Sequence, residues 1–257
     1  MVNKGLEFDI NVDIIKSTSG FEWNFGLNAT MFSNEITRLP EDSRENGIIT
    51  GTKKLLEGRS IYDFWLRDWY GVDPDTGEPL YVYDPESEEA PNNVFKTVDG
   101  VQLTNNQNHA LYTYNGSSIP DVYGAFTNTV SFKNFTLSVL FSYSIGGKIY
   151  DSNYQSLMST DDASAVHKDI AKRWKQPGDI TDVPKLSINN DVNIIATSDR
   201  WLTDASYLNL RNINLGYQFQ RSTVQNLGLN GLRMYVSAEN LFWLSARKGM
   251  NPMETFN

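Results

Sequence analysis

Apolar and polar residues alternate with a period of two in six stretches of this chain. The first stretch places Leu6, Phe8, Ile10, Val12 and Ile14 on one face and Glu7, Asp9, Asn11 and Asp13 on the other. The other five cover residues 21–31, 122–132, 135–145, 208–219 and 232–242. Because a β-strand turns successive side chains to opposite faces of its sheet, the pattern predicts six strands, each with one apolar and one polar face.

Strand length and the lengths of the links favour a barrel in a membrane over a soluble sandwich, which can show the same alternation. A strand of about ten residues, rising about 3.4 Å per residue and tilted by about 45°, spans roughly 24 Å, which is close to the apolar band of an outer-membrane barrel. The links at residues 16–20, 133–134 and 220–231 are short, whereas those at 33–121 and 147–205 are long. Outer-membrane barrels sort their short turns and long loops in this way.

Two local features depart from simple alternation. Leu208 and Leu210 have the wrong parity for the fifth strand, and a β-bulge near Arg211 would bring them back to its apolar face. In the second long link, Val166, Ile170 and Trp174 recur at helical spacing, so a short helix is predicted over residues 162–175, before Pro177 and Gly178.

Composition excludes several classes of protein. The 257 residues contain no cysteine, which rules out a disulfide scaffold, and no run of 18 apolar residues that would predict a membrane helix. The net charge is −9, and residues 41–99 alone carry −8. The absence of a basic patch argues against a nucleic-acid partner. An acidic first link also predicts a neutral substrate rather than a polyanion, because like charges repel.

Signatures of catalysis and metal binding are weak. His109 and His167 lie far apart in the sequence and belong to no zinc or hydrolase motif. Asp73, Asp75 and Gly77 (DPDTG) resemble the first residues of a calcium loop, but the two flanking prolines suit a turn better. The sequence therefore predicts no enzyme activity, no catalytic residue, no metal site and no cofactor.

Aromatic residues in the two long links are the best candidates for contact with a substrate or a partner protein. They are Trp65, Trp69, Tyr70, Tyr81, Tyr83, Trp174 and Trp201. An aromatic ring can stack on a sugar or anchor a protein interface. The alternative is that these rings pack the long links against each other and form a core for them.

Several phrases, in order along the chain, resemble one known family. They are NKGLEFDINVDII, GRSIYDFWLRDWYGVDPDTGEPLY, SYSIGGKIYDSNY, KRWKQPGDITDVPKL, SDRWLTDASYLNLRNINLGYQF and LRMYVSAENLFWLSARKGMNP. Together they closely resemble the C-terminal part of the SusC/RagA family of TonB-linked outer-membrane transporters. The resemblance covers nearly the whole chain.

The resemblance implies an all-β fold: about six strands of a larger, plugged transmembrane antiparallel barrel, with long extracellular loops and a short loop helix. Residues 1–257 would form the C-terminal part of the barrel, with the plug, the TonB box and the last strand outside the sequence. Glu7, Asp9, Asn24, Arg233 and Glu239 would face the lumen.

The family also implies a function and a place in the cell. Its members import oligosaccharides, and in some cases peptides, across the cell outer membrane of Bacteroidota. They use the TonB complex and a SusD-like surface lipoprotein, and lipid surrounds the barrel. The alternative from the residues alone is a soluble, cell-surface, carbohydrate-binding β-sandwich, in which the apolar faces of two sheets would form one core.

Overall fold

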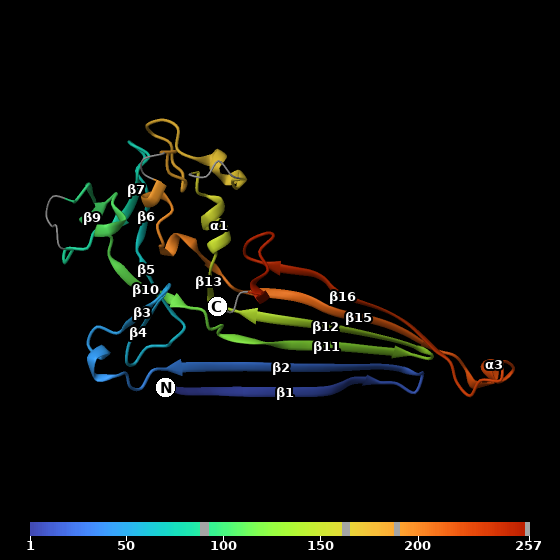
Figure 1. Ribbon diagram of the computed structural model, residues 1–257. Coiled ribbons are helices and arrows are strands. Elements are labelled where there is room, and N and C mark those ends of the chain that lie inside the picture. The colour runs from blue at the N-terminus through green and yellow to red at the C-terminus, as the bar shows by residue number, and fades with distance from the viewer. Residues whose placement is uncertain (88–92, 161–164, 188–190, 255–257) are drawn as a thin grey trace. The chain divides into compact units, whose positions relative to one another are not determined.

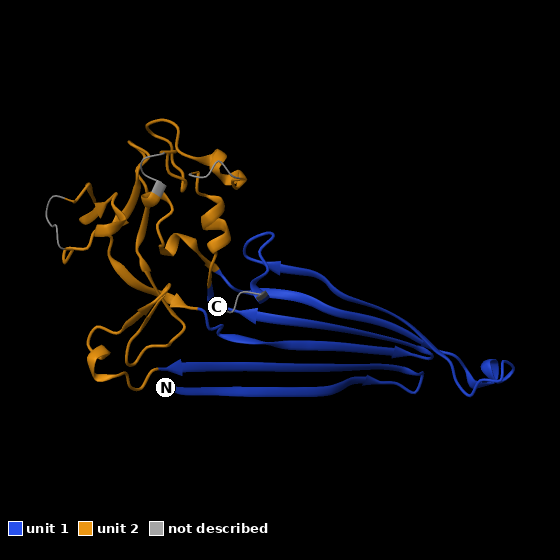
Figure 2. Cartoon of the chain, in the orientation of Figure 1, with its two compact units in different colours: residues 1–35, 118–148, 204–257 blue, residues 36–117, 149–203 orange. Residues whose placement is uncertain are grey.

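The computed structural model describes residues 1–87, 93–160, 165–187 and 191–254. The chain divides into two compact units (Figure 2). The sheet unit comprises Met1–Glu35, Ser118–Lys148 and Asp204–Asn257, and the loop unit comprises Ile36–Ser117 and Ile149–Thr203. Each unit is built from segments that are far apart in the sequence, so neither is a continuous stretch of chain.

One antiparallel sheet of six long strands makes up most of the sheet unit (Figure 1). Its strands, in spatial order, are β1 (Val2–Lys16), β2 (Phe21–Glu35), β11 (Val122–Phe132), β12 (Phe135–Ile145), β15 (Tyr207–Gln218) and β16 (Arg233–Ser245). All six strands predicted from the alternation are therefore present, and each pairs with its neighbour in the sequence order of the six.

The register places the two kinds of side chain on opposite faces of this sheet. Residues directly opposite each other in antiparallel strands share a face. One row across the six strands reads Ile10, Leu27, Phe126, Phe141, Leu210 and Phe242. Another row, on the other face, reads Asp13, Asn24, Thr129, Ser138, Asn214 and Ser237. The sheet thus has one continuous apolar face and one continuous polar face.

The predicted bulge in the fifth strand is confirmed. Arg211 is skipped in both of the ladders that β15 makes, because Leu210 and Asn212 pair with consecutive residues of β12. The skip moves Leu208 and Leu210 onto the apolar face, opposite Leu244 and Phe242. A second irregularity, at Ile14 in β1, was not predicted.

The apolar face carries large side chains that nothing in the sheet unit covers. Leu6 of β1 is 62% exposed and Val236 of β16 is 74% exposed. A soluble sandwich would bury such residues against a second sheet, but the described part of the sheet unit has only one sheet of this size. The sheet unit therefore does not pack as the sandwich alternative requires, and the predicted fold class, an all-β fold with about six long antiparallel strands and long loops, is confirmed.

The strand ends at one side of the sheet carry only short links. Ser17–Gly20 joins β1 to β2, and Lys133 with Asn134 joins β11 to β12, with Lys133 in the left-handed region at a φ of 54°. Residues 219–232, which include α3 (Arg221–Gln225), join β15 to β16. The strand ends at the other side carry the long links. The sorting by length predicted from the sequence is confirmed.

The loop unit combines both long links into one structure. Its strands are short, and most of them form two four-stranded sheets. The first sheet contains β3 (Ile48–Thr50), β4 (Lys53–Leu55), β5 (Asp63–Arg67) and β10 (Tyr112–Ser117). The second contains β6 (Trp69–Val72), β7 (Pro79–Val82), β8 (Lys96–Val98) and β9 (Val101–Thr104). A two-stranded sheet pairs β13 (Lys148–Tyr150) with β14 (Leu202–Asp204).

Helices in the loop unit are short, and the one predicted over 162–175 is wrong in its extent. Residues 161–164 lie outside the described residues, and the rest of that range holds only a 3₁₀ helix, Lys168–Lys172. Ile170 is buried, whereas Trp174 turns to a different partner, so the three residues at helical spacing do not share one packing surface. The α-helices of the loop unit are α1 (Ser152–Leu157) and α2 (Asp191–Ile194), and further 3₁₀ helices span Glu41–Ser43, Gln107–His109 and Asp199–Trp201. One 3₁₀ helix of the sheet unit spans Pro252–Glu254.

Among the described residues, no helix has both the length and the apolar character needed to cross a membrane.

Candidate functional site

Trp201 and Tyr81 form the core of the loop unit, and both side chains are fully buried. Trp201 packs with Met158, Ile170 and Val183, and its indole N–H donates to the carbonyl oxygen of Ala196 at 2.8 Å. The Tyr81 hydroxyl donates to the carbonyl oxygen of Asn193 at 2.6 Å. Burial raises the pKa of this hydroxyl well above its ordinary value. Every one of these contacts lies within the loop unit, so both rings stabilise its fold.

Three of the seven aromatic candidates therefore need correction. Tyr81, Tyr83 and Trp201 are buried, so they pack inside the loop unit instead of presenting a surface to a substrate or a partner. Trp69 belongs to the same cluster, because its ring lies edge-on to that of Tyr81 at a centroid distance of 5.2 Å. The packing alternative holds for these four residues. A large link needs such a core to stay ordered.

Arg200 is the residue of this core that sequence reasoning missed. Its guanidinium lies between two indole rings, 4.6 Å from that of Trp69 and 4.5 Å from that of Trp201. It donates to the carbonyl oxygens of Ile194 at 3.0 Å and Asp182 at 2.9 Å. Burial lowers the pKa of Arg200, and its planar donors are satisfied by carbonyls. The phrase SDRW carries this residue, but only the fold reveals the stacking.

The neighbouring Asp199 joins the two long links through hydrogen bonds. One carboxylate oxygen accepts from the backbone N–H of Trp69 at 2.8 Å, and the other accepts from the side-chain amide of Asn115 at 3.3 Å. Arg67 of the first link also joins the two. Its guanidinium donates to the carbonyl oxygen of Gln107 at 2.8 Å, in the same link, and to that of Thr197 at 3.2 Å, in the second link. The second long link therefore completes the structure of the first.

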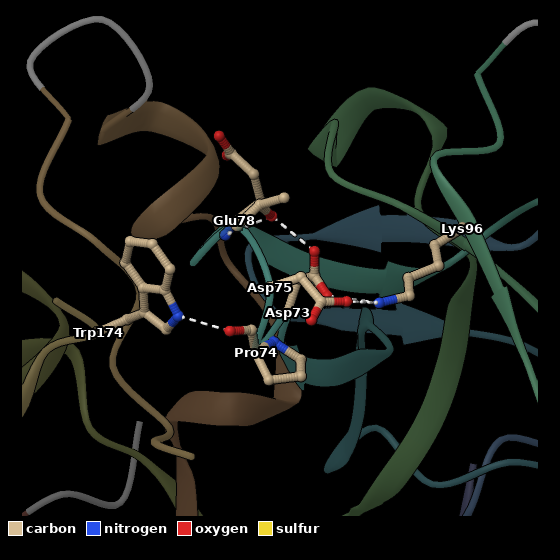
Figure 3. Close-up of polar contacts among 7 residues, drawn as sticks. Asp73, Pro74, Asp75, Glu78, Lys96 and Trp174 are labelled. Carbon is tan, nitrogen blue, oxygen red and sulfur yellow. Dashed lines mark hydrogen bonds and ion pairs between the residues drawn. The ribbon is translucent and has the colours of Figure 1, made fainter. Parts of the chain in front are cut away.

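The DPDTG segment is the turn of the hairpin formed by β6 and β7, as the sequence predicts (Figure 3). Asp73 is buried and accepts from the hydroxyl of Thr76 at 2.6 Å. The ammonium group of Lys96 lies 2.8 Å from a carboxylate oxygen of Asp73 and 2.8 Å from one of Asp75. A lysine side chain thus occupies the position between these two carboxylates.

These contacts shift the pKa of Asp73. Burial by itself raises the pKa of this carboxyl, but the hydrogen bonds from Lys96 and Thr76 outweigh burial and hold it below its ordinary value. The hydrogen bonds to Asp73 and Asp75 raise the pKa of Lys96. The turn is therefore an ion-paired structure at neutral pH. The nearby Glu78 is also paired, with Lys185 at 2.7 Å.

Trp174 docks the second long link onto this turn (Figure 3). Its indole N–H donates to the carbonyl oxygen of Pro74 at 2.9 Å, and the backbone N–H of Gly178 donates to the same oxygen at 2.8 Å. Gly77, at a φ of 74°, leaves the room that the ring needs, because a Cβ there would lie 2.5 Å from the Trp174 ring. Two of the sequence segments that resemble the family, GRSIYDFWLRDWYGVDPDTGEPLY and KRWKQPGDITDVPKL, are in contact here.

Trp65 and Tyr70 are the two remaining aromatic candidates, and neither is buried. Tyr70 is 43% exposed. Trp65 is half-buried on β5, 4.7 Å from the ring of Tyr114 on the paired strand β10. The ammonium group of Lys54 lies 4.5 Å from the Trp65 ring centroid, and the guanidinium of Arg59 lies 4.3 Å from that of Tyr114. Sequence reasoning named Trp65 but missed its three neighbours.

The five residues expected to face the lumen share the polar face of the sheet unit. Glu7 and Asp9 lie opposite Thr30 and Asn28. The Asn24 amide donates to Asn11 at 2.7 Å and to Asp13 at 3.0 Å. At the other edge, Arg233 lies opposite Gln218 and Glu239 opposite Asn212. Glu7, Asp9, Asn24, Arg233 and Glu239 are thus brought to one surface by strands from both ends of the chain.

Curated proteins resemble this chain along nearly its whole length. TonB-dependent receptor P3 of Formosa agariphila is 27% identical over 97% of this chain and 25% of its own length. TonB-dependent receptor SusC of Bacteroides thetaiotaomicron is 25% identical over 97% of this chain and 24% of its own length. Along nearly its whole length the chain is thus similar to SusC/RagA-type TonB-dependent receptors. It spans about a quarter of the length of these curated relatives.

Solved structures agree with this assignment at the level of the fold. A chain in the structure of the RagAB peptide importer in its closed-closed state superposes with a TM-score of 0.78 and 24% identity, over 97% of this chain and 26% of that one. A second structure of the RagAB peptide transporter gives a TM-score of 0.76 and 23% identity. No model of a protein family matches the sequence. The similar SusC/RagA-type proteins are receptors and an importer by name, and none is named as an enzyme.

Proposed function

We propose that this SusC/RagA-type sequence forms wall and extracellular loops in a TonB-dependent importer of the cell outer membrane. In this proposal residues 1–257 are the C-terminal part of a larger barrel. The plug and TonB box lie upstream in the longer protein, and a closing strand follows. The apolar face of the sheet unit contacts lipid, and the polar face, with Glu7, Asp9, Asn24, Arg233 and Glu239, lines the lumen.

The observation that carries the proposal is the two-faced sheet. Its apolar face runs unbroken across six strands and stays exposed, which is unfavourable in water and favourable in lipid. Even a polar group on that face has an internal partner, because the Trp23 indole donates to the side-chain oxygen of Asn128 at 3.1 Å. Both outer edges, β1 and β16, lack a partner strand in the described chain, and a barrel needs such edges paired.

The substrate class that fits the proposal is an oligosaccharide, with a peptide as the second candidate. SusC is one relative, and the RagAB structures are titled as a peptide transporter and a peptide importer. We propose that a SusD-like surface lipoprotein covers the loop unit and that the TonB complex supplies energy through the upstream plug. Accessible aromatic residues of the loop unit, Trp65 and Tyr70 among them, would contact the substrate or this partner.

The import proposal is tested by uptake. The gene is deleted and restored in its natural host, in backgrounds with and without TonB, and growth is measured on a panel of oligosaccharides and peptides. We expect growth on at least one of them to require both the gene and TonB. Import that survives the loss of TonB would contradict active transport and favour a passive porin.

The topology is tested independently of transport. Protease sites are inserted one at a time into a long link, after Gly100, and into a short link, after Gly228, and whole cells are treated with the protease. We expect cleavage at the first site only, with cleavage at both sites in broken cells as the control. Cleavage of intact cells at Gly228 alone would reverse the topology.

A further inference from the structure

A small surface of the loop unit combines two aromatic rings with two cations that form no ion pair with any residue that the structure describes. It consists of Lys54, Arg59, Trp65 and Tyr114, and we call it the cationic aromatic face. The rings of Trp65 and Tyr114 lie 4.7 Å apart on the paired strands β5 and β10. Lys54 lies over the Trp65 ring and Arg59 over the Tyr114 ring. The two cations thus flank one aromatic pair.

The charged groups of these two residues are available to a ligand. In the part of the chain that the structure describes, neither Lys54 nor Arg59 makes a side-chain hydrogen bond or ion pair, and Arg59 is exposed. The adjacent Lys53 differs: its ammonium group donates to the carbonyl oxygen of Tyr62 at 2.6 Å and packs 3.3 Å from the centroid of the Phe64 ring. Lys54 and Arg59 therefore keep eight N–H donors between them unpaired by protein.

Four acidic residues of the first long link do not cancel this charge, because they are paired with other cations. Asp73 and Asp75 hold Lys96, Glu78 holds Lys185, and Glu57 lies 3.3 Å from Arg44. Asp63 lies two residues before Trp65 on β5, so it shares a face with that ring, and its carboxylate accepts from the backbone N–H of Ser60 at 3.3 Å. The uneven distribution leaves a local positive surface on a protein of net charge −9.

The positions of the two rings are fixed by their neighbours. The Tyr114 hydroxyl donates to the backbone carbonyl of Lys54 at 3.2 Å, which ties β10 to β4. Tyr112 stacks beside Trp65 at a centroid distance of 6.1 Å and an interplanar angle of 20°. The Arg67 guanidinium, 4.8 Å from the Tyr112 ring, is held by two carbonyls. A surface that is ordered before binding loses less entropy when a ligand arrives.

We propose that the cationic aromatic face binds acidic oligosaccharides, those that carry uronate carboxylates or sulfate esters. A sugar ring offers an apolar face that stacks on Trp65 or Tyr114, and its anionic group accepts charge-assisted hydrogen bonds from Lys54 and Arg59. A neutral sugar would leave both cations unused. The inference rests on the import function proposed above and narrows its substrate class. It reverses the expectation of a neutral substrate, which came from the net charge of the link alone.

The test uses the full-length protein, purified in detergent, and calorimetric titration with four probes. They are a hexamer of galacturonate, a sulfated hexasaccharide, the neutral maltohexaose and an acidic decapeptide. We expect at least one acidic sugar to bind tenfold or more tightly than maltohexaose, with an affinity that falls as salt is raised. The double variant Lys54→Gln with Arg59→Gln should lose at least tenfold in affinity for that probe. Trp65→Ala should also lose affinity, and Trp65→Phe should retain more.

The control is Lys168→Gln, which removes an exposed cation of the loop unit that lies over no aromatic ring of the described residues. It should bind the acidic probe as the wild type does. Equal binding by the double variant and the wild type, a preference for maltohexaose, or binding of no acidic sugar would each overturn the inference. Binding of the decapeptide alone would overturn the assignment to sugars. TonB-dependent growth unaffected by the double variant would overturn this inference and leave the import proposal standing.

Discussion

The sheet unit and the loop unit use the same kinds of residue in opposite ways. In the sheet unit, large apolar side chains such as Leu6 and Val236 are exposed, and small polar residues lie together on the other face. In the loop unit, Trp201, Tyr81 and Leu66 are fully buried, as in a water-soluble protein. This contrast is the one expected if, as proposed above, the sheet unit faces lipid and the loop unit faces water, although one chain passes repeatedly between them.

The two units also differ in how far apart in the sequence their contacts lie. The sheet unit is an antiparallel succession of neighbours, so its pattern can be read locally. The core of the loop unit combines residues of both long links. Residues in contact there can lie more than a hundred positions apart in the sequence, as the hydrogen bond between Trp69 and Asp199 shows. A substitution should therefore disturb the sheet unit by exposing the wrong face to lipid, and the loop unit by opening its shared core.

The largest effect should come from the core of the loop unit. Trp201→Ala removes a fully buried indole and its hydrogen bond to Ala196, and we expect a loss of about 3–5 kcal/mol in the stability of that unit. The measurement is chymotrypsin cleavage of the full-length protein in detergent, followed as a function of urea. Tyr70→Ala, at an exposed position, is the control and should change stability by less than about 0.5 kcal/mol. Similar losses for both variants would argue against a shared core.

The next effect should come from the apolar face of the sheet unit. Val139→Arg puts a charge in the middle of that face and should cost about 2–4 kcal/mol on insertion into a bilayer, whereas Ser138→Arg on the polar face should cost much less. Folding into lipid vesicles from urea, followed by tryptophan fluorescence, gives both values. Equal costs at these adjacent positions would mean that the two faces do not meet different solvents.

These two regions also show what sequence reasoning reached and where it stopped. All six strands, the bulge at Arg211 and the sorting of links follow from the period-two pattern, because each depends on residues close in sequence. The helix over 162–175 was predicted from Ile170 and Trp174, but these side chains pack on separate partners that only the fold brings near. For the same reason the sequence named Trp65 as a candidate and could not place Arg59 beside Tyr114.

A smaller effect is expected at Gly77, where the two long links meet. There the cost of a steric clash can be separated from the cost of backbone strain. Gly77 and Gly178 both have positive φ, at 74° and 95°, so alanine strains the backbone at either position. Only at Gly77 would the new Cβ meet the Trp174 ring, since the Gly178 position is open. Gly77→Ala should therefore cost about 1–3 kcal/mol more than Gly178→Ala, measured by the same urea-dependent cleavage. Equal costs would show that the Trp174 ring moves aside without an energetic cost.

The smallest effect should be the response of the hairpin turn to acid. The pKa of Asp73 is held below its ordinary value, so its charged form stabilises the folded turn. That contribution is complete above the unfolded pKa, about 4, and disappears as the pH falls through the lower folded value. We therefore expect cleavage between β6 and β7 by an acid-stable protease to rise only below about pH 4.

Three variants test whether Asp73 is the group that titrates. In Lys96→Met the rise should begin at higher pH, because Asp73 loses the hydrogen bond that does most to lower its pKa. Asp73→Asn should show a flatter dependence on pH than the wild type. The control, Lys185→Met, removes a cation that pairs with Glu78 instead, and it should leave the onset of cleavage unchanged. An onset that Lys96→Met fails to move would show that the turn owes its acid sensitivity to other carboxylates.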